Sequence, residues 1–419
     1  MMMGVVNGLV RFAGYVAGWG SGKARTWHQA QNEAIERWNR AIETLPGEKV
    51  LFHVSSVGEY EQIAPVISLL KKRFPDINVL VSYFSPSVEK FKHNWNVDYA
   101  DYLPFGNNED IRNWIRLVNP KFIGFVKYDH WPDHLRVFKN EGVPVYSIAS
   151  VYSESDYYFK WYGLLGRKFL SYYDYHLVQD EKSKALLELI GIKNVSVVGD
   201  PRVDRALEVA RTVWSNSLIE VWMDKHRLPV IVAGSTYCPE EELIAEVSDK
   251  LPVRWIIAPH ELSNKRLEEV QALWGGDAIL LSQMKEGFNG KAIIIDRPGI
   301  LKYVYRYGKL AIIGGGFTKQ IHNILEPISY GLPVLTGPKL GKFLEAQYLS
   351  RNGGLKVFTT ADELFYWLQL LLFVNAEIDR SRRAVYEYIN TFRGASRKIV
   401  KFLVQRHFSG RKVVSEEVV

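Results

Sequence analysis

The sequence has almost no cysteine and lacks the common signatures of metal and nucleophile enzymes. Cys238 is the single cysteine in 419 residues. It excludes an internal disulfide and a cysteine-rich zinc site, and it fits a reducing compartment. No spacing of His, Asp and Glu suggests a metal site, and no Gly-x-Ser-x-Gly nucleophile elbow occurs. We therefore expect chemistry that uses neither a metal nor an organic cofactor.

A hydrophobic run of spanning length is also missing. Residues 4–19 are mostly apolar, but they contain Arg11, and the run is shorter than the ~20 residues that a spanning helix needs. Val5, Leu9 and Phe12 recur on one helical face. The stretch therefore predicts an interfacial helix on an anionic membrane surface. A helix docked on its own domain is the alternative.

The chain carries a modest excess of positive charge, which is spread along the sequence. The chain has 53 Lys and Arg against 46 Asp and Glu, a net charge of +7. This excess favours an anionic partner, such as a nucleotide or an anionic membrane surface. Because no long basic run and no nucleic-acid motif accompany it, a nucleic-acid partner is not expected.

Compact apolar runs alternate with helical patterns along most of the chain. This alternation predicts an α/β fold with parallel sheets that are covered on both faces. The length suggests at least two domains, and a charged helical stretch near residues 200–228 separates two similar halves. The expected organisation is a membrane-associating helix at 1–25, α/β domains at 26–208 and 209–390, and a C-terminal helix and tail at 391–419. The strands are expected at residues 49–54, 78–82, 99–103, 122–126, 143–148, 175–178, 195–198, 229–234, 254–259, 292–295, 310–313 and 333–335.

Unusual residues follow the expected strands of the first half, where ligands of parallel sheets bind. Glu59 comes just after a strand and Gly58, at a helix start. It is a candidate general base for an incoming hydroxyl, or a carboxylate placed favourably against the helix dipole. Lys127 and Asp129 follow another strand. They either orient an acceptor or form an ordinary surface ion pair.

The second half has a glycine-rich turn after an expected strand. Gly314, Gly315 and Gly316 precede His322, Asn323 and Glu326. Glycines and a helix start build anion sites in parallel sheets. Asn323 with Glu326 has the spacing of a capping box, and Glu326 is a candidate for sugar hydroxyls. A capped helix without any ligand is the alternative.

Two further strand ends offer polar groups. Ser235 and Thr236 follow Gly234 and either bind a phosphate or cap a helix. His260 follows Pro259 and is a candidate anion ligand, although most lone histidines are structural.

Together these segments resemble the 3-deoxy-D-manno-octulosonic acid (Kdo) transferases, glycosyltransferases of lipopolysaccharide assembly with a GT-B fold. The resemblance covers roughly residues 45–350. The segments that carry it, in family order, are His53-Val-Ser-Ser-Val-Gly-Glu59, Lys127-Tyr-Asp-His-Trp-Pro132, Gly142-Val-Pro-Val145, Ala233-Gly-Ser-Thr236 with Glu240-Glu241, Ala258-Pro-His260, Gly314 to Pro327 and Gly331-Leu-Pro-Val334.

The chain departs from the family pattern at three places. Asp129 stands where the family usually has Glu, which shortens the reach of the carboxylate. No Arg precedes His260, which is followed by Glu261. Arg202 stands where the family has Lys, in Gly199-Asp-Pro-Arg-Val-Asp204, and adds bidentate capacity.

The resemblance implies two Rossmann-like domains facing a central cleft and an inverting, metal-independent transfer of Kdo. The donor would be CMP-Kdo and the acceptor a lipid A precursor, at the cytoplasmic face of the bacterial inner membrane, where anionic lipid would hold the N-terminal helix. Glu59 would be the base, with Lys127 and Asp129 on the acceptor side. The CMP-sugar side would comprise Arg202, Ser235, Thr236, Pro259, His260, Gly315, Gly316, His322, Asn323 and Glu326, with Glu326 on the ribose hydroxyls.

Two other functions fit the same sequence. A GT-B glycosyltransferase or epimerase that uses another nucleotide sugar would keep both halves and the role of Glu326. A catalytically inactive membrane-surface binding protein would bind CMP without turnover, and the departures at Asp129 and His260 are what favour it.

Overall fold

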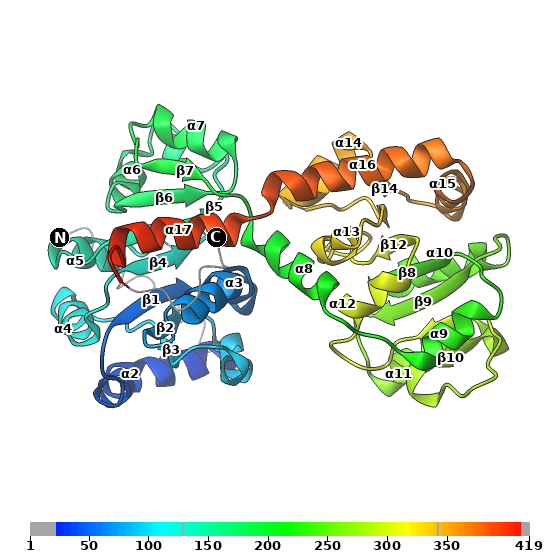
Figure 1. Cartoon of the computed structure of the whole chain (residues 1–419), viewed down its shortest axis with the longest axis horizontal. Coiled ribbons are helices and arrows are strands. Elements are labelled where there is room, and N and C mark those ends of the chain that lie inside the picture. Colours follow the sequence, from blue (N-terminus) through cyan, green and yellow to red (C-terminus); the bar gives the residue numbers. More distant parts are fainter. Residues whose placement is uncertain (1–21, 128–129, 342, 412–419) are drawn as a thin grey trace. The chain divides into compact units, whose positions relative to one another are not determined.

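The computed structural model describes residues 22–127, 130–341 and 343–411. The chain forms two compact units (Figure 1). The first comprises the residues up to Arg205 and those from Phe392 onwards, and the second comprises Ala206–Thr391. The chain passes between the units within two helices, α8 (Pro201–Arg211) and α16 (Asn375–Phe392). The expected helix at residues 4–19 lies outside the described residues.

The first unit is built on a parallel sheet of seven strands in the order β3-β2-β1-β4-β5-β6-β7. Strands β1 and β2 pair in register from Lys49 opposite Asn78 to Val54 opposite Tyr83. The strand bounds are β1 (Lys49–Val54), β2 (Asn78–Tyr83), β3 (Tyr99–Tyr102), β4 (Ile123–Val126), β5 (Val145–Ser150), β6 (Tyr175–Val178) and β7 (Val195–Val197).

Helices cover this sheet, and its central strands are buried almost throughout. Helix α17 packs beside α3, and its Ile399 and Leu403 join the core of the first unit. The helices of this unit are α2 (Gly22–Glu43), α3 (Val57–Arg73), α4 (Asn108–Val118), α5 (Pro132–Asn140), α6 (Leu164–Leu170), α7 (Glu181–Leu189) and α17 (Ala395–His407), with short 3-10 turns η1 (Pro86–Lys90), η2 (Lys92–Asn94) and η3 (Tyr157–Phe159).

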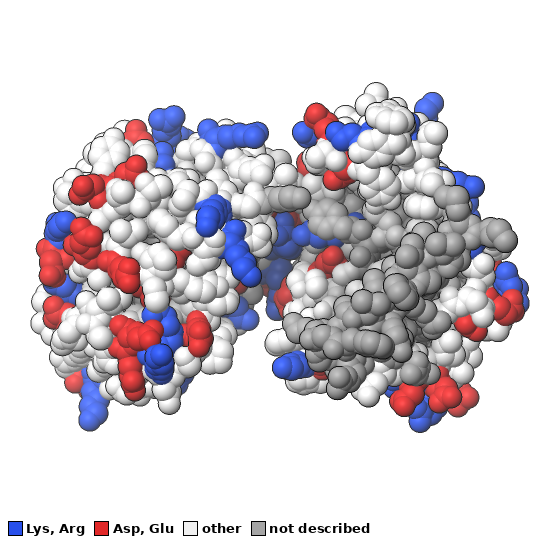
Figure 2. All heavy atoms as spheres, turned by 180° about the vertical axis from the view of Figure 1, so that it is seen from behind, with Lys and Arg blue, Asp and Glu red and all other residues white. Residues whose placement is uncertain are grey.

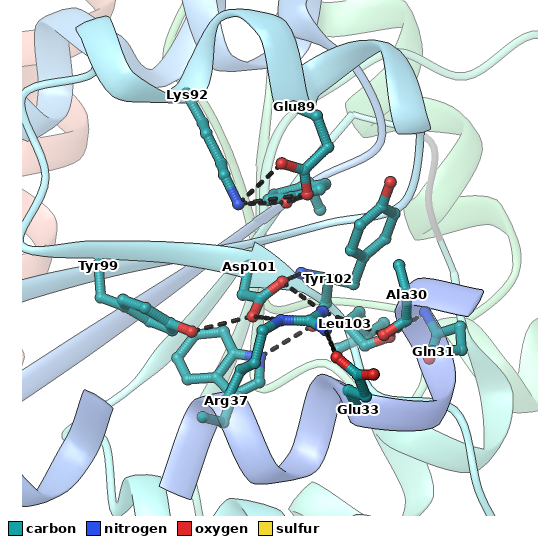
Figure 3. Close-up of polar contacts among 12 residues, drawn as sticks. Ala30, Gln31, Glu33, Arg37, Glu89, Lys92, Tyr99, Asp101, Tyr102 and Leu103 are labelled. Atoms are coloured by element: carbon teal, nitrogen blue, oxygen red, sulfur yellow. Dashed lines mark hydrogen bonds and ion pairs between the residues drawn. The ribbon is translucent and has the colours of Figure 1, made fainter. Parts of the chain in front are cut away.

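Helix α2 is attached to the edge strand β3 by buried polar contacts (Figure 3). Arg37 Nε lies 2.7 Å from Asp101 Oδ2, and Asp101 is 1% exposed. The indole N–H of Trp38 donates to the Tyr102 carbonyl at 2.8 Å. The ion pair raises the pKa of Arg37 through the hydrogen bond to Asp101. This first described helix is therefore part of the folded unit.

The second unit is built on another parallel sheet of seven strands, in the order β10-β11-β9-β8-β12-β13-β14. The strand bounds are β8 (Val230–Thr236), β9 (Arg254–Pro259), β10 (Ala278–Leu280), β11 (Ala292–Ile294), β12 (Leu310–Ile313), β13 (Val334–Thr336) and β14 (Leu355–Val357). Its helices are α9 (Ser217–Asp224), α10 (Cys238–Ser248), α11 (Asn264–Ala272), α12 (Leu301–Val304), α13 (Leu325–Ser329), α14 (Leu344–Asn352) and α15 (Ala361–Phe373), with 3-10 turns η4 (Gly275–Asp277), η5 (Leu281–Gln283) and η6 (Tyr305–Tyr307).

The prediction of two α/β halves with parallel sheets is confirmed. The twelve expected strands are all present, but two strands were missed. Both missed strands, β10 and β14, have three residues, form a sheet edge and bury only one residue fully. Such strands have too little apolar sequence to stand out from a loop.

Two surface properties bear on function. On the face drawn in Figure 2, Lys and Arg side chains lie interspersed with Asp and Glu side chains and with wide uncharged areas. The excess positive charge of the sequence therefore does not gather into one patch on that face. Within the part of the chain that the structure describes, no helix has both the length and the apolar character needed to cross a membrane.

Candidate active site

The two sheets place their sequence-predicted residues at equivalent points of the topology. In the first sheet the strand order reverses between β1 and β4, and in the second between β8 and β12. Open α/β sheets bind ligands beyond the carboxyl ends of the strands at such a switch point. Glu59 follows β1 and Lys127 follows β4, whereas Ser235 is the next-to-last residue of β8 and Gly315 follows β12.

Backbone conformation marks the same strand ends. Lys127, Ala149 and Ser235 have positive φ of 62°, 54° and 53°. Each lies at or just after the carboxyl end of a parallel strand. A residue with a Cβ adopts this backbone conformation at a cost in conformational energy, and such strain clusters at functional sites. The strain at Lys127 is held by hydrogen bonds, because its N–H donates to the Ile148 carbonyl at 3.0 Å and its carbonyl accepts from Ser150 Oγ at 2.8 Å.

Glu59 lies in the first turn of α3, partly exposed. The helix is capped by Ser56, whose side chain makes no capping hydrogen bond. The Glu59 carboxylate instead accepts from the backbone N–H of Ser55. The contact supports the placement of this carboxylate at the helix start. It also fixes Glu59 beside the end of β1, where its role as a base stays a prediction.

A buried histidine holds the loop after β4. Trp131 Nε1–H donates to His53 Nε2 at 3.1 Å, so the proton of the neutral imidazole lies on Nδ1. His53 Nδ1 then donates to Ser82 Oγ at 3.0 Å. His53 is fully buried in β1. The chain Trp131–His53–Ser82 ties the Lys127 loop to the central strands. Asp129 lies outside the described residues.

The expected donor contact Arg202 is engaged with its own neighbour. Arg202 Nη2 lies 2.6 Å from Asp200 Oδ2, and Nε lies 3.0 Å from the same oxygen. Asp200 is fully buried, and it also accepts from Gln62 Nε2 at 3.4 Å. Gln62 is on α3, three residues after Glu59. The pair Asp200–Arg202 thus contacts the helix that carries the candidate base.

The glycines after β12 allow backbones to approach closely. A Cβ on Gly314 would lie 2.1 Å from the Ser235 carbonyl oxygen, and one on Gly316 would lie 2.6 Å from the Gly337 nitrogen. Gly315 has a φ of +91°. These glycines therefore serve to pack the loops after β8, β12 and β13 together, whatever else they bind.

The N–H groups of this glycine loop bind a carboxylate of the chain itself. Glu240 Oε1 accepts from Gly315 N at 2.8 Å and from Phe317 N at 3.4 Å, and Oε2 accepts from Tyr237 N at 3.2 Å. Glu240 is fully buried, and burial raises its pKa above the usual range although these N–H donors act in the opposite direction. The anion expected at Gly315 is, in part, Glu240.

Glu241 organises Thr236 in the same way. The Thr236 hydroxyl donates to Glu241 Oε1 at 2.7 Å, and Arg266 donates to Oε2. Thr236 is 1% exposed and Glu241 is fully buried. Glu240 and Glu241 therefore hold two loops in place. The sequence prediction assigned these two residues no role in the site.

Three rings stack at the ends of β8, β9 and β12. The centroids of His260 and His322 lie 4.4 Å apart with 24° between the planes, and Tyr237 lies 5.0 Å from His260. His322 Nε2 lies 3.1 Å from Tyr237 Oη. Burial, followed by the neighbouring His260, lowers the pKa of His322. The structure thus brings His260 and His322 together and adds Tyr237, which the sequence did not single out.

The capping prediction for Asn323 is wrong by one residue. Helix α13 begins at Leu325 and its cap is Ile324. If Asn323 were the cap, Pro327 would be the fourth residue of the helix. The helix needs an N–H there to bond the carbonyl one turn before, and the proline ring would also clash with that carbonyl. Moving the start places Pro327 in the first turn. Asn323 Oδ1 still accepts from Leu325 N at 3.0 Å, and its amide donates to Glu326 Oε1 at 3.3 Å.

The remaining predicted residues lie around this cluster. Pro259 ends β9 opposite Thr236. Glu326 lies near Tyr305, and its negative charge, second to burial, raises the pKa of that phenol. Among the described residues no group of three or more His, Cys, Asp and Glu is arranged to hold a metal ion.

Comparison with known proteins shows which family the chain resembles. Residues 26–205 match the model of the 3-deoxy-D-manno-octulosonic-acid transferase (Kdo transferase) family. The Kdo transferase of Aquifex aeolicus is 27% identical over 354 residues, which cover 81% of this chain and 92% of that protein. Over most of its length the chain is therefore similar to Kdo transferases. That of Haemophilus influenzae is 24% identical over 385 residues, 85% of this chain and 87% of that protein.

Solved structures show the same fold at low identity. A UDP-N-acetylglucosamine 2-epimerase superposes with a TM-score of 0.61 at 16% identity, covering 87% of this chain and 97% of its own. A glycosyltransferase from Rickettsia africae gives a TM-score of 0.53 at 14% identity, covering 85% and 98%. These likenesses establish a GT-B-like fold and nothing about the substrate. The family match and the curated relatives together support a Kdo glycosyltransferase of lipopolysaccharide synthesis.

Proposed function

We propose that this protein transfers Kdo from CMP-Kdo to a hydroxyl of a lipid A precursor, with inversion and without a metal. The observation that carries the proposal is the position of Glu59. Its carboxylate follows the switch-point strand β1, is partly exposed, and is held by the Ser55 N–H. A carboxylate fixed in this way is suited to take a proton from a bound hydroxyl.

The reaction would proceed in one displacement. The acceptor oxygen forms a bond to the anomeric carbon of Kdo while its proton passes to Glu59. The bond from that carbon to the phosphate oxygen of CMP breaks, and CMP leaves with the electron pair. Attack from the face opposite the leaving group inverts the anomeric centre.

The second unit would hold the donor. Negative charge grows on the CMP phosphate as it leaves, and polar groups already fixed in place lower the cost of that charge. The groups proposed to face it are Ser235, His322 and Asn323, with His260 stacked behind His322. Glu326 would accept from the ribose hydroxyls.

Several predicted ligands would act indirectly. The Thr236 hydroxyl donates to Glu241, and the Gly315 N–H donates to Glu240. We propose that Thr236, Pro259, Gly315 and Gly316 shape the donor site rather than bind the phosphate. Arg202 would reach the donor while Asp200 orients its guanidinium. Lys127 and Asp129 would orient the acceptor.

The test is turnover with a defined acceptor. The purified full chain is incubated with CMP-Kdo, generated in situ, and a tetraacylated, bisphosphorylated lipid A precursor, while CMP release and product mass are followed. A mass increase of one or more Kdo units with matching CMP release is expected, with and without a chelator. Release from UDP-sugars instead would favour another nucleotide-sugar enzyme. CMP binding without any turnover would favour an inactive binding protein.

The membrane surface is the proposed place of action, because the acceptor is a lipid. Residues 4–19 would lie on the cytoplasmic face of the inner membrane with Arg11 at anionic headgroups. Fractionation of cells that express the full chain should find it with the inner membrane, released by high salt if the attachment is peripheral.

A further inference from the structure

The connection between β5 and β6 exposes an unusual group of large apolar side chains. Five of them fall within nine residues, in and between η3 and α6. Their exposed fractions are 45% for Tyr157, 88% for Trp161, 60% for Tyr162, 70% for Leu164 and 53% for Leu165. Scattered exposed apolar residues need no explanation, but a contiguous group marks an interaction surface.

The chain holds this group in a fixed shape. Arg167 donates from Nε to the Tyr158 carbonyl and from Nη2 to the Lys160 carbonyl, both at 2.9 Å. A Cβ on Gly163 would lie 2.1 Å from the Tyr157 carbonyl oxygen, so the turn needs a glycine. Tyr158 packs inward on the small core around Leu170. The outward side chains are therefore presented by an ordered turn.

The charge of the segment is of one sign. Residues 157–168 include Lys160, Arg167 and Lys168 and no Asp or Glu. Trp and Tyr settle at the interface between headgroups and hydrocarbon, Leu enters the acyl layer, and Lys attracts anionic headgroups. Aromatic, aliphatic and cationic side chains in one ordered turn match an anionic lipid surface better than they match a protein partner.

We propose that residues 157–168 form a membrane-docking surface, named here the 157–168 surface, which inserts Trp161 and Leu164 into an anionic bilayer. It is separate in sequence from residues 4–19. The inference rests on the proposed function for the reason to be at a membrane, and on the exposed side chains for its location. It gives the first unit its own contact with the lipid that carries the acceptor.

A site-specific fluorophore tests this in the full chain. Cys238 is the single cysteine and is exposed, so Cys238→Ser with Tyr162→Cys places one environment-sensitive label on the surface. The matched control is Cys238→Ser with Tyr366→Cys, since Tyr366 on α15 is 56% exposed. Vesicles of phosphatidylethanolamine and phosphatidylglycerol should shift the label at 162 to the blue and expose it to nitroxide-lipid quenching, and should leave the label at 366 unchanged.

Further variants separate the contributions of the lysines from those of the apolar side chains. They also test whether a second copy of the chain occupies the surface instead of lipid. Lys160→Ala with Lys168→Ala should weaken the lipid response at 162 by about 25-fold, at roughly fivefold per cation, and Trp161→Ser with Leu164→Ser should abolish it. A label at 162 that stays water-exposed while the protein is vesicle-bound overturns the proposal. So does a dimer in lipid-free solution that Trp161→Ser dissociates, because the surface would then bind a second copy.

The vesicles contain neither CMP-Kdo nor acceptor, so this result is independent of turnover. Lipid insertion at 162 in a chain that releases no CMP would keep the docking surface and reject the proposed function. Turnover on micellar acceptor without insertion at 162 would do the reverse.

Discussion

The two switch points of the molecule use their carboxylates in opposite ways. At the first, Glu59 is partly exposed beyond the carboxyl end of β1 and accepts a hydrogen bond from the backbone N–H of Ser55. At the second, Glu240 and Glu241 are fully buried and bind the glycine loop, Thr236 and Arg266. The first switch point leaves a carboxylate partly exposed, and the second contains two carboxylates that serve as internal supports.

The outward groups differ accordingly. Around β8, β9 and β12 the side chains that reach the surface include the imidazoles of His260 and His322 and the amide of Asn323, beside the partly exposed carboxylate of Glu326. An imidazole or an amide repels an incoming anion less than a carboxylate does. The same parallel-sheet topology can therefore leave an acid partly exposed, as at Glu59, or bury its acids, as at Glu240 and Glu241.

The largest effect should come from removing the surface carboxylate. Glu59→Gln keeps an acceptor for the Ser55 N–H but cannot take a proton, so turnover should fall by roughly 10²–10⁴-fold. CMP release and product mass measure it, with CMP affinity unchanged. Glu61→Gln, at an exposed neighbour on the same helix, is the matched control. Full activity of Glu59→Gln would show that another group accepts the proton.

The buried supports should matter for stability before chemistry. Glu240→Ala leaves the N–H groups of Gly315, Phe317 and Tyr237 without their acceptor, which should cost about 2–4 kcal/mol of unfolding free energy. CMP affinity should fall at least about tenfold, because the loop loses its shape. Urea unfolding and calorimetric titration measure the two effects. Glu242→Ala, at an exposed neighbour, should be silent; an equally silent Glu240→Ala would remove the distinction between supports and surface acids.

Acid should lower the stability of the first unit through its buried histidines. Burial lowers the pKa of His134 to about 4 and that of His176 to about 3, and both belong to the first unit. The unfolded chain binds these protons more readily, so the free energy of unfolding should fall as pH drops from about 6.5 towards 4. For His134 alone the loss at pH 4.5 is about 2–3 kcal/mol.

Denaturant titrations at pH 7 and pH 4.5 test this dependence. His134→Gln can still donate to the Pro104 carbonyl and does not titrate, so it should flatten the pH dependence. His226→Gln, at an exposed histidine of the second unit, should not. An unchanged slope in His134→Gln would place the acid sensitivity elsewhere.

The smallest effect should be at Asn323. Asn323→Ala removes the acceptor for the Leu325 N–H and should cost about 1 kcal/mol, the usual loss at a helix start. CMP affinity should fall severalfold, whereas Asn352→Ala, at an exposed position of α14, should change neither. Thermal unfolding and titration with CMP measure both. A large stability loss with intact CMP binding would make Asn323 a structural residue only.

The fold could be predicted from the sequence because buried parallel strands appear in it as compact apolar runs. The runs at Lys49–Val54 and Arg254–Pro259 coincide with strands to the residue, whereas the edge strands β10 and β14 left no such run. The strand-end rule picked loops that follow β1, β4, β8 and β12, the strands of the two switch points, and the neighbouring β9; that these loops bind the substrates stays a prediction.

The sequence could not predict which groups these residues contact. Nothing local distinguishes an N–H group that awaits a phosphate from one that binds Glu240, because that carboxylate lies 75 residues earlier in the chain. His53 left one signal, a polar residue inside an apolar strand, but its link to Trp131 depends on tertiary contact. Asn323 failed as a cap because Pro327 moved the helix start.

The division of the chain into units has a consequence for its synthesis. The first unit takes Ile399 and Leu403 of α17 into its core, and Asp204 of α8 accepts from Gly394 N and Ser396 N at the start of that helix. The ribosome therefore completes the whole of Ala206–Thr391 before it delivers the last core helix of the first unit. The half that begins first is finished last, and a chain that ends before residue 395 would lack the helix that completes the core of the first unit.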